Sequence, residues 1–336
     1  MPRHDGRTAQ IGDTLSAAQP RPQPAARSLA AAIRQPRRGG ALERAVEMVI
    51  YGTGVLTLVL LIGILVLLAQ QGLRLFLEFD YSFWRFLTYP NAITDNTSHP
   101  EDFRFGIIAP LIATLWVTLV TLVLAVPLGL ATAVYISEIA PPGVRLYIKS
   151  AAELLAGVPT ILFGFVGLFL LVPFVRDQFG WGAGGMSGMT AGIVVAFIAV
   201  PLIISIADDA LQAVPVDFRE NAYALGCNKL QAIWFVIMPA AISGLAAAAM
   251  LGMARAVGET MAVLILAGGN SSITDSPFDS MRTMTATIAS GFGNASAYSL
   301  LRPALFMTGL VLFAITFFTT VIADAVLEKQ RKRFSR

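Results

Sequence analysis

Two charged residues, Arg255 and Glu259, interrupt an apolar stretch that runs from Pro239 to Asn270. The stretch is long enough for a helix that crosses a bilayer, and a spacing of four residues places both side chains on one face of such a helix. A charge at membrane depth costs roughly 2.5–3.5 kcal/mol on insertion scales, so it usually faces a pathway or a partner. A guanidinium matches phosphate-like oxygens and stays charged when it loses water. The sequence therefore offers Arg255 as a cation for an anion that crosses the membrane, with Glu259 balancing its charge when no anion is bound.

The same spacing also fits a structural role. In that interpretation Glu259 neutralises Arg255 permanently, and the ion pair holds the span to its neighbours. Spacing alone leaves both interpretations open.

Other residues with reactive side chains form no recognisable catalytic set. The two histidines, His4 and His99, lie outside the apolar stretches, and no Ser/His/Asp arrangement indicates hydrolysis. The ATP-binding pattern G-x-x-x-x-G-K-[ST] is missing from the sequence. Cys227 is the single cysteine, which excludes an intrachain disulfide and favours a reduced thiol. We expect no catalytic residue, no metal and no cofactor, and a chain that is not itself an enzyme.

The composition predicts an integral membrane protein. Of 336 residues, 56% are hydrophobic and only 13% are charged, whereas soluble domains carry about 25% charged residues. Six apolar stretches are long enough to span a bilayer, and the expected fold is an all-α membrane protein with six transmembrane helices. We place them near 46–69, 107–136, 151–174, 189–207, 240–267 and 303–323.

Basic residues set the expected orientation. With the N-terminus inside, seventeen Lys and Arg fall in cytosolic segments and six in outer loops, which predicts that both termini are cytosolic. Residues 1–44 are rich in Arg and Pro and predict a disordered cytosolic tail. Residues 45–328 form the predicted transmembrane domain, and 329–336 a basic cytosolic tail. The outer loop 70–106 is rich in aromatic residues, which favours an interfacial belt over a docking surface for an external partner.

The cytosolic segment 213–239 carries signals for two short helices. Asp217 and Glu220 have the spacing of a capping box, and Gly226 predicts the end of a helix over Phe218–Leu225. Asn228 predicts the start of a second helix, which runs to residue 239. A single amphipathic helix on the membrane surface is the simpler alternative.

From Glu220 to Gly226 this segment reads E-N-A-Y-A-L-G, and I-M-P follows up to Pro239. It resembles the EAA loop of ABC importer permeases, E-x-A-x-x-x-G followed by I-x-P, with an Asn and a Met where the family usually has Ala and Leu. In that family the loop forms a coupling helix that enters a groove on a separate ATPase subunit. The resemblance implies that Glu220, Ala222 and Gly226 contact an ATPase.

The sequence of the charged span indicates which kind of importer permease the chain resembles. Arg255–Val263 reads R-A-V-G-E-T-M-A-V and is similar to the phosphate importer permeases of the PstC family, whereas the sister PstA permeases usually continue with A-P-L. Further agreement lies in 125–141 and 153–168, and the resemblance covers roughly residues 50–325. It implies a MetI-like permease fold in the cell (inner) membrane and a substrate pathway lined by Arg255, Glu259 and Thr260. The implied partners are a PstA-like sister permease, a PstB-like ATPase dimer and an external PstS-like phosphate-binding protein.

Two alternatives stay open. The same architecture could carry another oxyanion, such as phosphonate or molybdate. A stand-alone anion channel or secondary transporter would need no ATPase, and the pattern at Glu220–Gly226 argues against it.

Overall fold

The computed structural model describes residues 41–95, 99–296 and 298–334, which fold into helices and loops without a named strand. The chain divides after Gly63 into two units. Helix α2 (Ala41–Leu77) crosses this division, and the second unit, from Ile64 onward, contains the other named helices. Most of the predicted N-terminal tail, residues 1–40, lies outside the described residues.

The prediction of six membrane-spanning helices is confirmed for the described chain. Each segment is long and apolar enough to cross a bilayer, and each overlaps its predicted span, although the third and the fifth begin at clearly different residues. The segments are Arg44–Leu77, Ile108–Ile139, Thr160–Phe179, Gly188–Gln212, Lys229–Gly258 and Leu301–Ile322.

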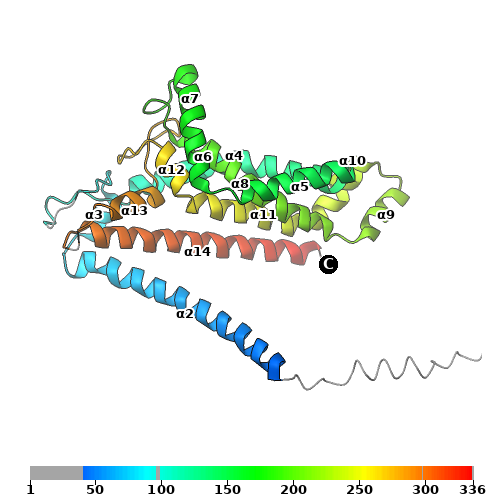
Figure 1. Ribbon diagram of the computed structural model, residues 1–336, viewed down its shortest axis with the longest axis horizontal. Coiled ribbons are helices and arrows are strands. Elements are labelled where there is room, and N and C mark those ends of the chain that lie inside the picture. The colour runs from blue at the N-terminus through cyan, green and yellow to red at the C-terminus, as the bar shows by residue number, and fades with distance from the viewer. Residues whose placement is uncertain (1–40, 96–98, 297, 335–336) are drawn as a thin grey trace, which may run out of the picture. The chain divides into compact units, whose positions relative to one another are not determined.

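Three helices form the centre of the second unit: α4 (Ile108–Val134), α8 (Gly188–Gln212) and α11 (Met238–Gly258) (Figure 1). They approach closely where glycines remove side chains. A Cβ added at Gly129 of α4 or at Gly252 of α11 would lie 2.6 or 2.7 Å from side-chain atoms of Ile203 on α8. Because Ile203 is fully buried, all three helices are held at one point.

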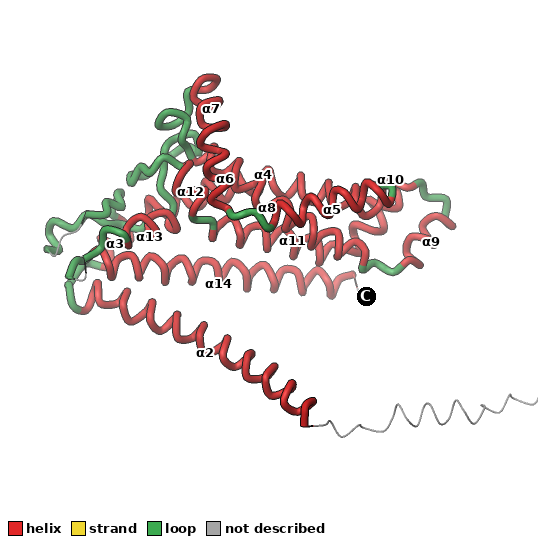
Figure 2. The backbone as a smooth tube through the Cα atoms, in the orientation of Figure 1, coloured by secondary structure: helices red, strands yellow, loops and turns green. Residues whose placement is uncertain are grey.

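Helix α14 (Leu301–Phe334) packs along α11 and against α13 (Met284–Phe292) (Figure 2). Its backbone stays helical up to residue 334. Residues 329–334 of the predicted basic tail thus continue this helix, and the last two residues lie outside the described chain.

The third span starts at Thr160, nine residues later than the predicted 151–174. Residues Pro142–Ala156 form a separate helix, α5, and the chain bends at Gly157 before the span starts at Thr160. The span then consists of α6 (Thr160–Val166), a π-helical segment (Gly167–Leu171) and α7 (Val172–Phe179). The bend follows from Pro159, which disfavours helical backbone in the residue before it.

Helix α5 is held beside α8 by charge. Lys149 Nζ lies 3.0 Å and Arg145 Nη2 3.6 Å from the carboxylate of Asp208, which is only 1% exposed. The hydrogen bond that Lys149 donates to Asp208 raises the pKa of Lys149. This helix therefore stays cationic at physiological pH and fixed to the end of α8.

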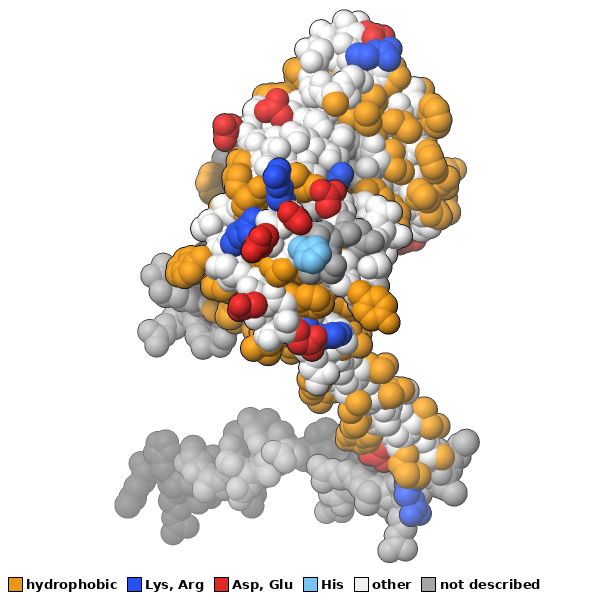
Figure 3. Space-filling view, turned by 90° about the vertical axis from the view of Figure 1, so that its left-hand side faces the viewer, with side chains coloured by type: hydrophobic (Ala, Val, Ile, Leu, Met, Phe, Trp, Pro, Cys, Tyr) orange, Lys and Arg blue, Asp and Glu red, His pale blue; other side chains and the backbone are white. Residues whose placement is uncertain are grey.

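The aromatic loop on the predicted outer side folds into a small core of its own. Tyr81, Phe86, Phe103 and Phe105 are almost fully buried, and the Tyr81 hydroxyl donates to the carbonyl of Phe105 at 2.9 Å. The favoured interfacial belt is wrong for these rings, although Trp84 of α3 (Phe83–Thr88) is exposed. Charged side chains of both signs are scattered over this end among hydrophobic and uncharged polar ones (Figure 3).

Candidate functional site

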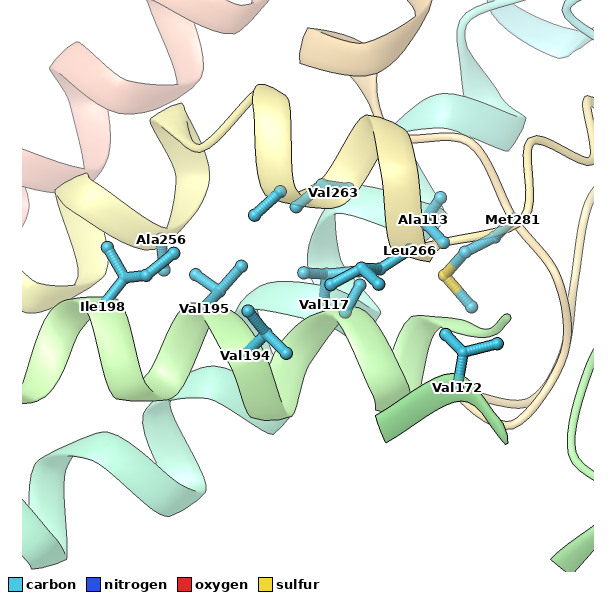
Figure 4. Packing of buried hydrophobic residues seen from close by; sticks show 13 residues of the cluster. Ala113, Val117, Val172, Val194, Val195, Ile198, Ala256, Val263, Leu266 and Met281 are labelled. Atoms are coloured by element: carbon cyan, nitrogen blue, oxygen red, sulfur yellow. The ribbon is translucent and has the colours of Figure 1, made fainter. Parts of the chain in front are cut away.

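The span that carries Arg255 and Glu259 is broken between them. Helix α11 ends at Gly258, Glu259 is extended (φ −68°, ψ 128°), and a short helix, α12, runs over Met261–Leu266. The continuous helix predicted over 240–267 is wrong at this point, so Arg255 and Glu259 do not share one helical face. Figure 4 shows the apolar core under the break, where Ala256 of α11 and Val263 of α12 pack with residues of α8.

Hydrogen bonds hold the break in place. Glu259 Oε1 accepts from the backbone N–H groups of Thr260 at 3.1 Å and Ala262 at 3.4 Å, so it caps the first turn of α12. The hydroxyl of Thr285 on α13 donates to the Glu259 carbonyl at 2.8 Å. Thr260, predicted in the pathway, lies at this break and donates its hydroxyl to the Gly258 carbonyl at 3.2 Å. The backbone groups freed by the break are thus partly satisfied inside the protein.

Arg255 has no ion pair and no hydrogen bond from its side chain within the described residues. Glu259 is 7% exposed, and its second oxygen, Oε2, also makes no hydrogen bond in that part of the chain. The permanent ion pair, and the balancing of Arg255 by Glu259, are therefore not formed in this structure.

Arg255 lies on an exposed face of the bundle. Gly258, Met261 and Leu264, which lie on the two sides of the break, are exposed as well. A guanidinium on such a face would be expensive against hydrocarbon. The face therefore needs a polar pathway or a protein partner to cover it.

At the predicted cytosolic end, the chain makes two turns before α11. Helix α9 covers Val216–Ala224 and begins after Pro215 without a side-chain cap, so the capping box predicted from Asp217 and Glu220 is wrong. The end of this helix is confirmed, because Gly226 has the positive φ of +85° that favours glycine.

The second capping signal is confirmed. Asn228 and Gln231 exchange the two hydrogen bonds of a capping box, both at 2.9 Å. Helix α10 (Lys229–Ala232) then passes through a π-helical segment (Ile233–Ile237) directly into α11. The second short helix of the prediction is thus the beginning of the charged span.

The three residues predicted to contact an ATPase lie in different environments. Glu220 and Gly226 are exposed, as are the apolar side chains of Phe218 and Leu225. Ala222 is only 3% exposed, so it seats α9 on the bundle and offers no surface to a partner. The expectation that Ala222 makes such a contact does not fit its burial.

An anchor that the sequence did not reveal fixes α9 to the bundle. Arg219 Nη2 lies 2.8 Å from Glu138 Oε1, and the two side chains are 20% and 7% exposed. Arg219 also donates to the carbonyls of Val214 at 2.7 Å and Leu211 at 2.9 Å. Glu138 belongs to the π-helical end of α4, Tyr135–Ile139, and no local spacing connects residues this far apart in sequence.

Within the described ranges, no three His, Cys, Asp or Glu side chains lie together as metal ligands would.

A family model described as "Binding-protein-dependent transport system inner membrane component" matches residues 125–332. A curated relative from Bacillus subtilis, "Probable ABC transporter permease protein YqgH", is 34% identical and covers 81% of this chain and 86% of its own. The "Phosphate transport system permease protein PstC" of Mesorhizobium japonicum is 33% identical over 81% and 86% of the two chains. The protein of the same name from Xylella fastidiosa is 34% identical over 68% and 76%.

Among solved structures, a chain of the inward-facing MetNI methionine ABC transporter is similar, with a TM-score of 0.52. It is 18% identical, and the match covers 67% of this chain and 95% of that chain. At this identity the likeness supports the fold, which is that of a MetI-type permease.

Replacing Glu138 by Gln should destabilise the protein. The substitution removes the charge that Arg219 meets in a largely buried place, and the loss should be about 1–3 kcal/mol in the free energy of unfolding. Thermal unfolding of the solubilised protein measures it. Glu220→Gln is the matched control on exposed α9 and should stay within about 0.5 kcal/mol. Equal stability of the two variants would show that the anchor contributes nothing.

Proposed function

Since the chain belongs to the family of binding-protein-dependent transport system inner membrane components, we propose that it is the permease subunit of an ATP-driven phosphate importer. The family fixes the broader description: a multi-pass inner-membrane subunit of an ABC transporter that works with a separate ATPase and a substrate-binding protein. Phosphate as the cargo is supported by the PstC names of several relatives. By the same reasoning the partners are a PstA-like sister permease, a PstB-like ATPase and a PstS-like binding protein.

One observation carries this proposal: Arg255 is an unpaired cation on an exposed face of a membrane-spanning helix. In a low-dielectric path, a guanidinium attracts an anion much more strongly than it does in water. Its two parallel N–H groups fit two oxygens of a phosphate. Because no carboxylate pairs with Arg255 in the described structure, an arriving anion breaks no ion pair. The sister permease covers the exposed face and closes the path.

Glu259 has two duties in this proposal. Its Oε1 caps α12 and so fixes the position of the carboxylate. Its Oε2 remains available to accept a hydrogen bond from a protonated phosphate oxygen. Sulfate has no such proton at neutral pH, so the same carboxylate repels it without compensation. The negative charge also weakens the hold of Arg255 and favours release.

The cytosolic turn supplies the coupling. Glu220, Gly226 and the exposed apolar side chains of α9 form the surface that meets the ATPase. The ion pair between Arg219 and Glu138 connects α9 to α4. Helix α10 continues into α11, which carries Arg255. Movement of α9 therefore reaches the pathway by a buried ion pair and by a continuous helix.

Another oxyanion, phosphonate or molybdate, is the second candidate, because the guanidinium of Arg255 fits any tetrahedral oxyanion. Competition between these anions and labelled phosphate during uptake separates the two. A channel that works without an ATPase would leave the anchored α9 surface without a use.

Arg255→Gln should lower phosphate uptake by the reconstituted complex about tenfold or more, since a tenfold loss corresponds to only about 1.4 kcal/mol of anion binding. Arg255→Lys keeps the charge without the planar fork, so its rate of phosphate uptake should lie between those of the wild type and Arg255→Gln. Arg302→Gln, an exposed residue at the start of α14, is the control and should transport normally. Full uptake by Arg255→Gln would contradict the proposal.

Glu259→Gln should relax selectivity. The amide oxygen can still cap α12, so the fold is kept while the charge that opposes sulfate is lost. We expect sulfate to inhibit phosphate uptake several-fold more strongly in the variant than in the wild type, because one repulsive charge in the path has been removed. Unchanged rate and selectivity would leave Glu259 with a capping role alone.

Glu220→Lys should reduce the amount of ATPase that co-purifies with the permease about tenfold, because like-charge contacts and lost complementarity weaken an interface strongly. Gly226→Asp should act in the same direction. Asp177→Lys reverses a charge on exposed α7, at the opposite end of the predicted topology, and should co-purify the ATPase normally. Normal recovery with Glu220→Lys would remove α9 from the interface.

A further inference from the structure

A cavity of about 200 Å³ lies where α12 ends, on the predicted outer side of the break. Helix α12, helix α13 and the loops that follow α12 and precede α13 all contribute to its wall. The wall includes Leu264, Gly268, Gly269, Met281, Arg282 and Ser290.

Arg282 is the charged residue in this wall, and it is unpaired. Its side chain is half-buried, and within the described residues it makes no hydrogen bond or ion pair, even with the loop carboxylates of Asp275 and Asp279. Burial lowers the pKa of Arg282, although an arginine remains charged at neutral pH. A cation that is half removed from water and has no partner is disfavoured, so a bound anion would stabilise this arrangement.

Two glycines keep the neighbouring loop close to the guanidinium. Gly268 and Gly269 have φ values of +90° and +79°, and a Cβ added at Gly269 would lie 3.7 Å from Arg282 Nη2. A Cβ at Gly268 would collide with Ser280. Backbone hydrogen bonds from Gly269 to Met281 at 3.1 Å and from Met281 to Ala267 at 2.8 Å join the two loops. These contacts between the two loops therefore fix the backbone that carries Arg282.

Exposed residues lie along the chain between the cavity and Arg255. Leu264 lines the cavity, and Leu264, Met261 and Gly258 are all exposed. The six residues of α12 rise by about 9 Å. An anion that leaves Arg282 therefore has to pass the length of α12 before it reaches Arg255.

We propose that Arg282 and this cavity form an outer holding site for the transported tetrahedral oxyanion, which then moves along the exposed face of α12 to Arg255. This inference rests on the proposed function and adds a site to it. A single half-buried guanidinium holds the anion weakly, which allows it to be passed on. Ser290, whose hydroxyl already donates to the Ala286 carbonyl at 2.8 Å, can accept a hydrogen bond from a protonated anion.

The test uses the complete transport complex in membrane vesicles, with Cys227→Ala to remove the natural thiol and Ser290→Cys to place a probe in the cavity. The modification rates by an anionic and a cationic methanethiosulfonate are compared. A local positive charge concentrates the anionic reagent. We therefore expect the ratio of the anionic to the cationic modification rate to fall about tenfold in the Arg282→Gln variant. Arg282→Lys and Arg302→Gln are the matched controls and should keep the ratio. Inorganic phosphate should slow the modification in every variant that has Arg or Lys at position 282.

The outcomes separate this inference from the proposed function. If Arg282→Gln leaves the ratio and the protection by phosphate unchanged, the outer site is overturned, even where Arg255→Gln abolishes phosphate uptake. If the ratio falls but only molybdate or phosphonate protects the probe, the site is supported and phosphate is overturned as the cargo. If the ratio falls and none of these anions protects, the cavity is not an oxyanion site.

Discussion

A single charge in an environment that cannot solvate it determines much of this architecture. Arg255 stands on an exposed face of α11 with no carboxylate paired to it in the described chain. Hydrocarbon cannot compensate a guanidinium, so the isolated subunit is incomplete on this face. In the proposed complex, a second permease covers this face and encloses a polar path. The cost of desolvating the Arg255 guanidinium, which a partner subunit would relieve, also favours the binding of an anion.

The interruption of the span at Glu259 belongs to the same problem. Irregular backbone is tolerated at membrane depth only where protein or water satisfies its polar groups. Here the Glu259 carboxylate caps α12 and Thr285 from another helix binds the Glu259 carbonyl. The break therefore places the Glu259 carboxylate beside the proposed pathway, while several peptide groups at the break are hydrogen-bonded within the protein. It also separates Glu259 from Arg255, which keeps the cation available.

Between Arg255 and α9, the helices of the bundle are closely packed. Gly129 and Gly252 let α4 and α11 meet α8 at Ile203. The ion pair between Arg219 and Glu138 connects α9 to the end of α4 through a π-helical segment. Helices often kink at such segments. The proposed coupling surface on α9 is thus held to the core by an ion pair at a π-helical turn of α4.

The sequence by itself determined the features that depend on composition or on neighbours in the chain. Apolar length predicted six spans, the positive φ required at Gly226 ended α9, and Asn228 with Gln231 capped the next helix. Residue types at fixed spacings also indicated the permease family. These features are local, because a few consecutive residues contain the whole of the physical cause.

Only the tertiary structure decided where the helices break and which charges meet. Apolarity does not distinguish one span from two helices joined by a bend, so 151–174 and 240–267 were predicted as continuous. The break at Glu259 depends on a hydroxyl 26 residues away, and the anchor of α9 on a carboxylate 81 residues away. In the sequence, Arg282 is one residue of a polar loop. Only the fold places it in the wall of a cavity together with residues of α12 and α13. Contacts between distant segments set the environment of a charge, and that environment decides whether the charge is paired, solvated or free to bind a ligand.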